Sequence, residues 1–354
     1  MSLDAPRWRP FVSLPSYFGG KRRLVTTIFR EVDRVFPRRS WRGMTLVDAF
    51  LGGGSVSLWA KAQGFRVLCN DLADRSRFIA EGLVCNSRRK LLWEDVLRAL
   101  ADQAPGYAAA NLAPELLPPP VALAADAFIR AANSFPGPPE PQARPALLRL
   151  LAWKLIDYSR PFGQFGNKKF GRALHDRDFD QLRSVTVMKT ACDALTAPSA
   201  LARKGLEELN AGVIPGEAEF RQQDAFEFLA QNRADVAYLD SPYAGSSSYE
   251  HEYRHLDSLF AGRDIELPTS VFNSADGLAA LEQLLAAARG RYRLVIVSFG
   301  AMAHSPAEIL GVVQGVFPGA WRIPLRYRWS VGCKSGASYN ADEKEVLIVA
   351  PGEV

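Results

Sequence analysis

The sequence has few cysteines and no long apolar run. Its four cysteines, Cys69, Cys85, Cys192 and Cys333, form no CxxC pair, which argues against a disulfide framework or a structural zinc site and favours free thiols in a reducing compartment. No stretch approaches the ~18 apolar residues of a membrane span, and residues 1–10 lack the apolar core of a signal peptide. We therefore expect a cytoplasmic protein with no bound metal and no membrane partner.

The composition is that of an ordinary globular protein. The 354 residues are 48% hydrophobic and 23% charged, which excludes a disordered or collagen-like chain and leaves room for two domains or one domain with a large insertion. The net charge is +5, but residues 1–43 hold ten basic and only three acidic residues. Such a basic arm suits a polyanion or an anionic cofactor, and it also suits a solvated helix face.

The hydrophobic pattern predicts an α/β fold. The first elements expected are a helix at 21–36, a strand at 44–50, a glycine loop, a helix at 55–63 and a strand at 65–69 that is followed by an acidic residue. This order is typical of nucleotide-binding α/β proteins. Later strands are expected at 234–239 and 293–299, with a final pair at 321–329 and 345–350.

The middle of the chain interrupts this alternation. Residues 99–146 contain 10 of the 23 prolines, which makes central strands improbable there, and helices are expected at 121–133 and 147–158. We therefore predict one α/β domain in two pieces, 10–90 and 217–352, with an inserted, mostly helical domain at 91–216.

Two motifs flank the first strand. Phe50-Leu51-Gly52-Gly53-Gly54-Ser55 follows it, and glycines there let a backbone approach a ligand. Asp71 ends the next strand, which is the position of a carboxylate that binds ribose hydroxyls; the alternative is a structural turn. Before the first helix, Tyr17-Phe18-Gly19-Gly20-Lys21 offers backbone donors and one cation for a carboxylate, or is a plain helix start.

A third motif, Asp240-Ser241-Pro242-Tyr243, follows the apolar strand at 234–239. The carboxylate and a turn carbonyl can accept hydrogen bonds from a planar amine, and the ring can stack on a base. An ordinary strand-ending turn is the alternative. The residues before the four cysteines include no proline, which argues against a cysteine-nucleophile cytosine-C5 enzyme.

Together these motifs resemble those of the Dam-like DNA adenine-N6 methyltransferases, the D12 or alpha class. The resemblance covers about 10–90 and 218–350, including Tyr249, Tyr253, His255 and Leu256, which resemble the family's segment after its catalytic turn. It implies a Rossmann-like S-adenosylmethionine-dependent methyltransferase sheet. The family places its target-recognition domain where the inserted lobe occurs here.

The resemblance also implies a role for each matching residue. Those assigned to S-adenosylmethionine are Tyr17, Gly19, Gly20, Lys21, Phe50, Gly52, Gly54, Asp71 and Asp224. Asp240 and the Ser241 carbonyl would hold the target amine beside Pro242, and Tyr243 would stack on the flipped base. The family commonly has proline where this chain has Ser241, but the group that acts at this position is the carbonyl.

The expected substrate is double-stranded DNA. Lys168, Lys169 and Arg172 lie among aromatic residues and glycines of the inserted lobe, a pattern that suits phosphate contacts or a solvated basic surface. A role in restriction-modification is implied, with any endonuclease partner unknown. The alternatives are an N4-cytosine or RNA amine methyltransferase, which needs the same acceptors, and a catalytically weak DNA-binding relative.

Overall fold

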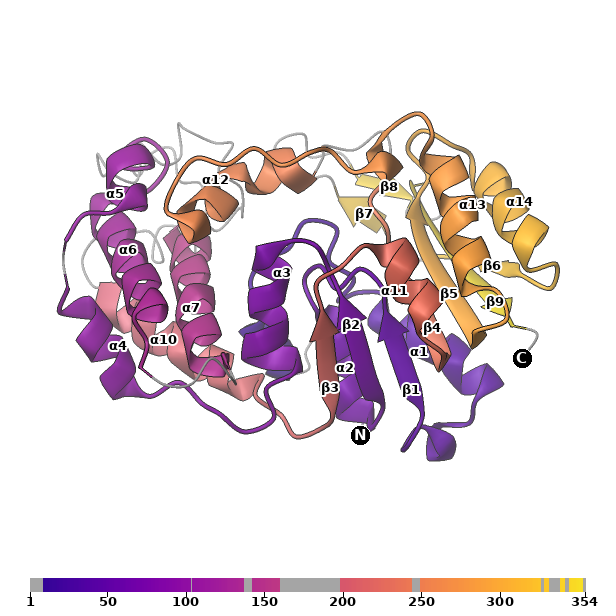
Figure 1. Ribbon diagram of the computed structural model, residues 1–354, viewed down its shortest axis with the longest axis horizontal. Helices are drawn as coiled ribbons and strands as arrows, with labels where there is room; N and C mark the ends of the chain where they lie inside the picture. The colour runs from indigo at the N-terminus through magenta and orange to yellow at the C-terminus, as the bar shows by residue number, and fades with distance from the viewer. Residues whose placement is uncertain are drawn as a thin grey trace.

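The structure is a computed structural model that describes residues 9–102, 104–136, 142–159, 198–243, 249–325, 328–330, 338–340 and 344–352. A seven-stranded sheet with helices on both faces occupies one half of the molecule, and a helical lobe occupies the other (Figure 1).

The main sheet has the strand order β3-β2-β1-β4-β5-β9-β6. Its strands are β1 (Thr45–Asp48), β2 (Arg66–Asn70), β3 (Ala218–Arg221), β4 (Ala234–Leu239), β5 (Tyr292–Gly300), β6 (Trp321–Ile323) and β9 (Glu345–Pro351). The first five are parallel, whereas β9 runs antiparallel between β5 and β6. The order reverses between β1 and β4, as in doubly wound folds, so the predicted Rossmann-like fold is confirmed.

The strands alternate their side chains between two apolar layers, as the period of two requires. Leu46 and Val236 belong to the layer beneath α1 (Val25–Val35) and α2 (Ser55–Gln63). Val47 and Ala237 belong to the opposite layer. That second layer is covered by α11 (Ala225–Gln231), α13 (Gly277–Ala288) and α14 (Pro306–Val316).

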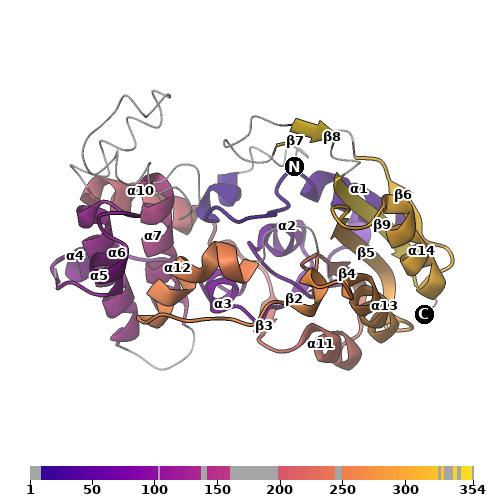
Figure 2. The same ribbon diagram turned by 90° about the horizontal axis from the view of Figure 1, so that it is seen from above.

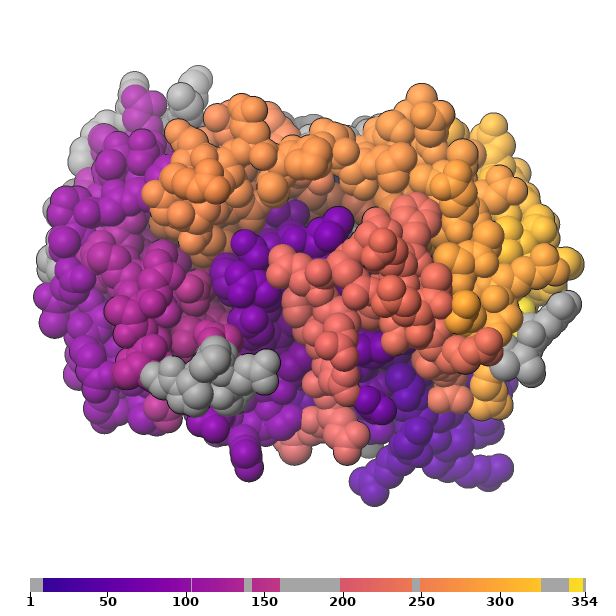
Figure 3. Space-filling view, in the orientation of Figure 1, coloured from indigo at the N-terminus to yellow at the C-terminus, as the bar shows by residue number. Residues whose placement is uncertain are grey.

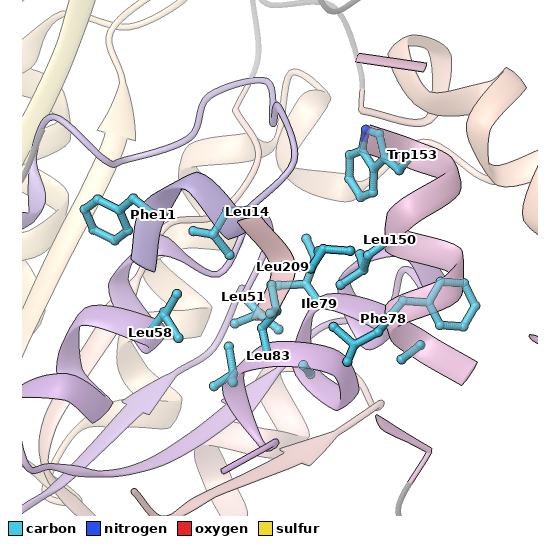
Figure 4. Close-up of a cluster of buried hydrophobic side chains, with 14 of the residues drawn as sticks. Phe11, Leu14, Leu51, Leu58, Phe78, Ile79, Leu83, Leu150, Trp153 and Leu209 are labelled. Carbon is cyan, nitrogen blue, oxygen red and sulfur yellow. The ribbon is translucent and has the colours of Figure 1, made fainter. Parts of the chain in front are cut away.

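The described part of 91–216 is helical. Its helices are α4 (Trp93–Leu100), α5 (Tyr107–Asn111), α6 (Pro119–Asn133), α7 (Ala143–Ser159) and α10 (Pro198–Ala211). Helix α7 packs on α6 and α10, and also on α3 (Asp74–Ile79) and the π-helical turn η4 (Ala80–Val84), which follow β2. Figure 4 shows side chains of these two groups, including Ile79, Leu150 and Leu209, in one apolar cluster. The lobe and the sheet therefore share a continuous core, and the predicted domain boundaries stay a prediction.

Helix α12 (Tyr249–Ala261) joins the two halves. It contacts α3 and α5, and the chain then continues to the short helix η6 (Val271–Asn273) beside α13. Figure 2 shows the same course from above, and in the space-filling view the segment forms a ridge from the lobe to the sheet (Figure 3).

Three expected elements were wrong in extent. The helix expected at 147–158 is α7, which begins at Ala143. Helix α1 begins at Val25, because Lys21–Leu24 form a turn that belongs to the site described below. The single strand expected at 321–329 is divided: β6 ends at Ile323, and β7 (Arg328–Ser330) pairs with β8 (Ser338–Asn340) in a separate small sheet. Pro324 accounts for the break, since it has no N–H to donate to a ladder.

Candidate active site

A cavity of about 360 Å³ lies at the carboxyl ends of β1, β2 and β4. This is the crevice of the switch point, where ligands bind in open α/β sheets. Tyr17, Asp71, Asp224 and Asp240, which come from four distant segments, all line it. The fold has therefore brought together the Tyr17 turn, the glycine loop with Asp71, and the Asp240 turn.

The glycine loop after β1 packs against Tyr17. A Cβ built on Gly53 would lie 2.6 Å from the Tyr17 Cβ, which is closer than real Cβ contacts allow. Gly54 is the N-cap of α2 with φ +72°, a left-handed conformation that glycine adopts readily. Gly52 and Phe50 line the cavity, whereas Gly54 shapes the loop from behind.

Asp71 ties this loop to the end of β2. Its Oδ2 accepts a hydrogen bond from the Gly52 N–H at 2.8 Å, and its Oδ1 accepts one from the Ala73 N–H at 2.9 Å. Each carboxylate oxygen can accept more than one hydrogen bond. Asp71 therefore holds the loop and still has acceptor capacity toward the cavity.

Aromatic rings form one end of the cavity. Phe226 and Phe272 are stacked, with centroids 5.7 Å apart and planes 7° apart, and Phe50 meets Phe272 edge-on at 5.6 Å. Leu72 and Val271, which are 67% and 48% exposed, also line this cavity. No sequence signal marked Phe272, Leu72 or Val271, because each stands in a loop or short turn without periodicity.

Asp224 lines the same end of the cavity and caps α11. Its Oδ1 accepts from the N–H groups of Phe226 at 2.9 Å and Glu227 at 3.3 Å. Capping of this kind accounts locally for an aspartate before the helix. It also fixes Phe226 at the cavity wall.

The turn at Tyr17 is held by α12 and α3. The Phe18 N–H donates to the Tyr253 hydroxyl at 2.6 Å, and the Tyr17 and Tyr253 rings are 5.1 Å apart. The Arg75 guanidinium lies 4.5 Å from the Tyr253 ring centroid and pairs with the buried Asp257 carboxylate. Tyr253, which the resemblance singled out, therefore supports the turn from behind.

Lys21 and Asp240, which are 6% and 17% exposed, form an ion pair in the wall of the cavity. The Lys21 Nζ is 2.9 Å from Asp240 Oδ1 and also donates to the Gly19 carbonyl at 2.9 Å. Burial raises the pKa of Asp240 to about 6, although Lys21 opposes this shift. Burial alone would lower the pKa of Lys21, but the carboxylates of Asp240 and Glu345 hold it well above its usual value. Both groups are therefore charged at pH 7.

The other residues of the turn Asp240–Tyr243 line different cavities or none. Pro242 lines the first cavity, and Ser241 is buried with an Oγ that has no hydrogen-bond partner within the described residues. The Tyr243 ring packs against Phe299 at 5.9 Å, and its carbonyl accepts from the Asn273 amide at 2.9 Å. Unlike Asp240, Tyr243 does not line the first cavity.

Tyr243 lines a second cavity of about 420 Å³ that adjoins the first. The two share Tyr17, Gly19, Gly20, Lys21, Gly53 and Ser55 as a common wall. Arg23 and Glu345 line only the second cavity. Two adjoining cavities with the Lys21–Asp240 pair beside their common wall suit a reaction between two bound substrates.

Asp48 was not among the residues expected at the site. It ends β1, is 1% exposed, and accepts from the Ser57 hydroxyl through Oδ2 at 2.7 Å. Its Oδ1 has no partner within the described residues, and burial raises its pKa to about 7. Its place between an apolar strand and the glycine loop could have marked it in the sequence.

Some expectations lie beyond what the structure tests. Lys168, Lys169 and Arg172 fall outside the described residues. Among the residues that are described, no group of three or more His, Cys, Asp or Glu side chains is placed to hold a metal ion. No helix in this part of the chain is long and apolar enough to cross a bilayer.

Residues 17–110 match the model of the D12 class N6 adenine-specific DNA methyltransferases. The resemblance is thereby confirmed over this segment, which includes the Tyr17 turn, the glycine loop and Asp71. The match ends before the Asp240–Tyr243 turn, which lies beyond residue 110. No curated protein matches the sequence significantly.

The solved structures similar to this one are remote. One is a SAM-dependent methyltransferase from Agrobacterium tumefaciens, with 9% identity over 93% of this chain and 62% of that one, at a TM-score of 0.37. Another is a putative SAM-dependent methyltransferase from Streptococcus mutans, with 11% identity over 94% and 49%, at a TM-score of 0.35. The chain thus spans less than two thirds of the length of either structure.

Proposed function

We propose that this protein transfers a methyl group from S-adenosylmethionine to the N6 amine of an adenine flipped out of double-stranded DNA. The observation that carries the proposal is the position of Asp240. Its carboxylate lies beside the wall shared by the two cavities, paired with Lys21, while Tyr243 stands in the second cavity. The adenine specificity rests on the family match at 17–110.

The first cavity fits the cofactor. The aromatic end formed by Phe50, Phe226 and Phe272 would take the adenine ring, and Asp71 would accept from the ribose hydroxyls. Asp48 Oδ1, which has no partner among the described residues, would accept from the methionine ammonium, since a buried carboxylate oxygen calls for a charged donor. The volume of about 360 Å³ is within the range of small-molecule sites.

The catalytic turn would act by positioning. When bound, the cofactor supplies a methyl group already activated by the sulfonium. The Asp240 carboxylate and the Ser241 carbonyl would accept the two amine hydrogens and draw the nitrogen lone pair out of the ring. The amine would then face the cofactor in line, and alignment of this kind supplies much of the rate enhancement in such reactions.

The target base would occupy the second cavity. Its amine is paired in duplex DNA, so the base must leave the stack before it can react. Tyr243 would stack on it, because the ring is backed by Phe299 and by Gly300, where a Cβ would lie only 2.1 Å from the ring. We propose the inserted domain at 91–216, with Lys168, Lys169 and Arg172, as the part that contacts the DNA backbone.

Expression in a methylation-free host tests the proposal. Single-molecule sequencing of the host DNA should show modified adenines at a recurring short site, and an Asp240→Asn variant produced at the same level should show none. Modified cytosines instead would favour an N4-cytosine enzyme. Cofactor binding by the pure protein with no transfer to DNA or RNA would contradict the proposal and favour a DNA-binding relative.

A further inference from the structure

The Lys21 ammonium is held by three acceptors from three segments of the chain. They are the Gly19 carbonyl at 2.9 Å, Asp240 Oδ1 at 2.9 Å and Glu345 Oε1 at 3.3 Å. The lysine side chain is 6% exposed, and an ammonium has three hydrogens to donate. The position of the ammonium is therefore set by all three acceptors, and Asp240 is only one of them.

Glu345 is held in place from its own side. It is the first residue of β9, registered opposite Gly300 of β5, and its Oε1 accepts from the Ser298 hydroxyl at 3.2 Å. Its side chain is 12% exposed and lines the second cavity together with Tyr243. The β5–β9 pair thus carries both the backing of Tyr243 and a second carboxylate for Lys21.

The cluster of Lys21, Asp240 and Glu345 holds more negative than positive charge. Two carboxylates share one ammonium, and the other titratable groups that face Asp240 are Tyr238 of β4, Asp48 of β1, Tyr249 of α12 and Tyr243 of the turn. Among the described residues, Glu345 is the carboxylate on the β9 side that draws Lys21 away from Asp240. Without Glu345, the lysine would be free to bridge both oxygens of the Asp240 carboxylate.

We propose that Glu345 is a positioning residue for methyl transfer. It draws the Lys21 ammonium toward β9, so that Lys21 engages one oxygen of Asp240 and leaves the other for the target amine. This inference rests on the proposed function for the amine, but the arrangement of Lys21 between two carboxylates does not depend on it.

Glu345→Gln is the variant that tests this role, because it keeps the side-chain shape and removes the charge. Lys21 should then pair more fully with Asp240, and the loss of a neighbouring negative charge should lower the pKa of Asp240 by about 0.5–1 unit. We expect kcat to fall about 10-fold or more, with the acid limb of the pH–rate profile at lower pH, and KM for S-adenosylmethionine within about 2-fold.

Two further variants show how large the effect of Glu345→Gln is by comparison. Ser298→Ala removes one anchor of Glu345 and should give a smaller change in the same direction. It also keeps the inference testable if Glu345→Gln folds poorly. Glu308→Gln is the matched control, since this exposed residue caps α14 and does not contact Lys21. It should leave both kcat and the pH profile unchanged.

The pKa of Asp240 can be followed without any activity, by carbon-13 NMR of aspartate-labelled protein with Asp240→Asn for assignment. An unchanged Asp240 titration in folded Glu345→Gln would overturn the inference, as would an unchanged kcat and pH profile in an active protein. If Glu345→Gln shifts the Asp240 titration but the wild-type protein methylates no nucleic acid, the proposed function alone is contradicted. The link between Glu345 and Asp240 would then still stand.

Discussion

Two carboxylates that line the first cavity, those of Asp71 and Asp240, are held in different ways. Asp71 is bonded to the backbone N–H groups of Gly52 and Ala73, whereas Asp240 is bonded to the side chain of Lys21. Backbone partners bind a carboxylate wherever the loop has its native shape, so Asp71 is part of the fold as well as of the proposed cofactor site. A side-chain partner can be removed without altering the backbone, so Asp240 can be varied mainly at the level of chemistry.

This comparison predicts that variants at Asp240 separate activity from binding. Asp240→Ala removes an acceptor for the amine, and we expect kcat to fall by about 10²–10³-fold or more. The Kd for S-adenosylmethionine should change by less than about 3-fold, because the proposed partner of Asp240 is the target amine and not the cofactor. Methyl-transfer kinetics and calorimetry check the two values. Turnover near that of the wild type would remove Asp240 from the mechanism.

At Asp71 we expect binding and stability to fall together. Asp71→Ala should weaken S-adenosylmethionine binding by roughly 1.5–3 kcal/mol for each charge-assisted hydrogen bond lost. It should also lower the free energy of unfolding by about 1–3 kcal/mol, because the N–H groups of Gly52 and Ala73 lose their acceptor.

Calorimetry and urea unfolding measure the two effects at Asp71. Asp74→Ala, which removes an exposed carboxylate paired with Arg77 on α3, is the control and should change both values little. Loss of stability with unchanged affinity would show that Asp71 serves the loop alone.

The pH dependence should differ between cofactor binding and turnover. The pKa of Asp48 is raised to about 7 and that of Asp240 to about 6, in both cases mainly by burial. Protonation removes the negative charge that each residue uses, so cofactor affinity should begin to fall below about pH 7 and kcat below about pH 6. Separate pH profiles of Kd and kcat check this order. Coincident limbs, or limbs in the reverse order, would contradict the assignment of Asp48 to the ammonium.

A smaller effect is expected from Gly53→Ala. The new methyl group would meet the Tyr17 side chain at 2.6 Å, so the ring has to move from the wall that the two cavities share. We expect cofactor affinity to fall about 10-fold, measured by calorimetry. Gly311→Ala on α14 is the control, since nothing lies within 4 Å of its Cβ position, and it should stabilise the protein by about 0.5–1 kcal/mol. Equal affinity of both variants would show that the packing at Gly53 is not needed.

Ser241→Pro should have the smallest effect. The Ser241 hydroxyl is buried without a partner in the described residues and lines neither cavity, and the carbonyl at this position survives the change. Proline would also favour the extended geometry of Asp240. We expect kcat within about 3-fold of the wild type, or somewhat higher through better preorganisation. A folded, cofactor-binding but inactive variant would mean that the turn needs its serine N–H or hydroxyl.

The sequence by itself determined where most strands of the sheet lie along the chain and which motif residues stand at their carboxyl ends. Apolar runs predicted β4 at 234–239 as observed, and helix α2 at 55–63 also has the expected bounds. Asp71 and Asp240 could be placed in one crevice because the carboxyl ends of parallel strands meet at the same edge of a sheet. These inferences need only local periodicity and strand direction.

Tertiary structure alone decided which groups meet across long stretches of chain. Phe272 reaches Phe226 through a loop without periodicity, and Glu345 reaches Lys21 only because β9 is inserted antiparallel beside β5 in one register. The orphaned oxygen of Asp48 likewise depends on which neighbours the packed core leaves near it. Local sequence fixes neither strand register nor the partners of a buried polar atom, since both result from the packing of distant segments.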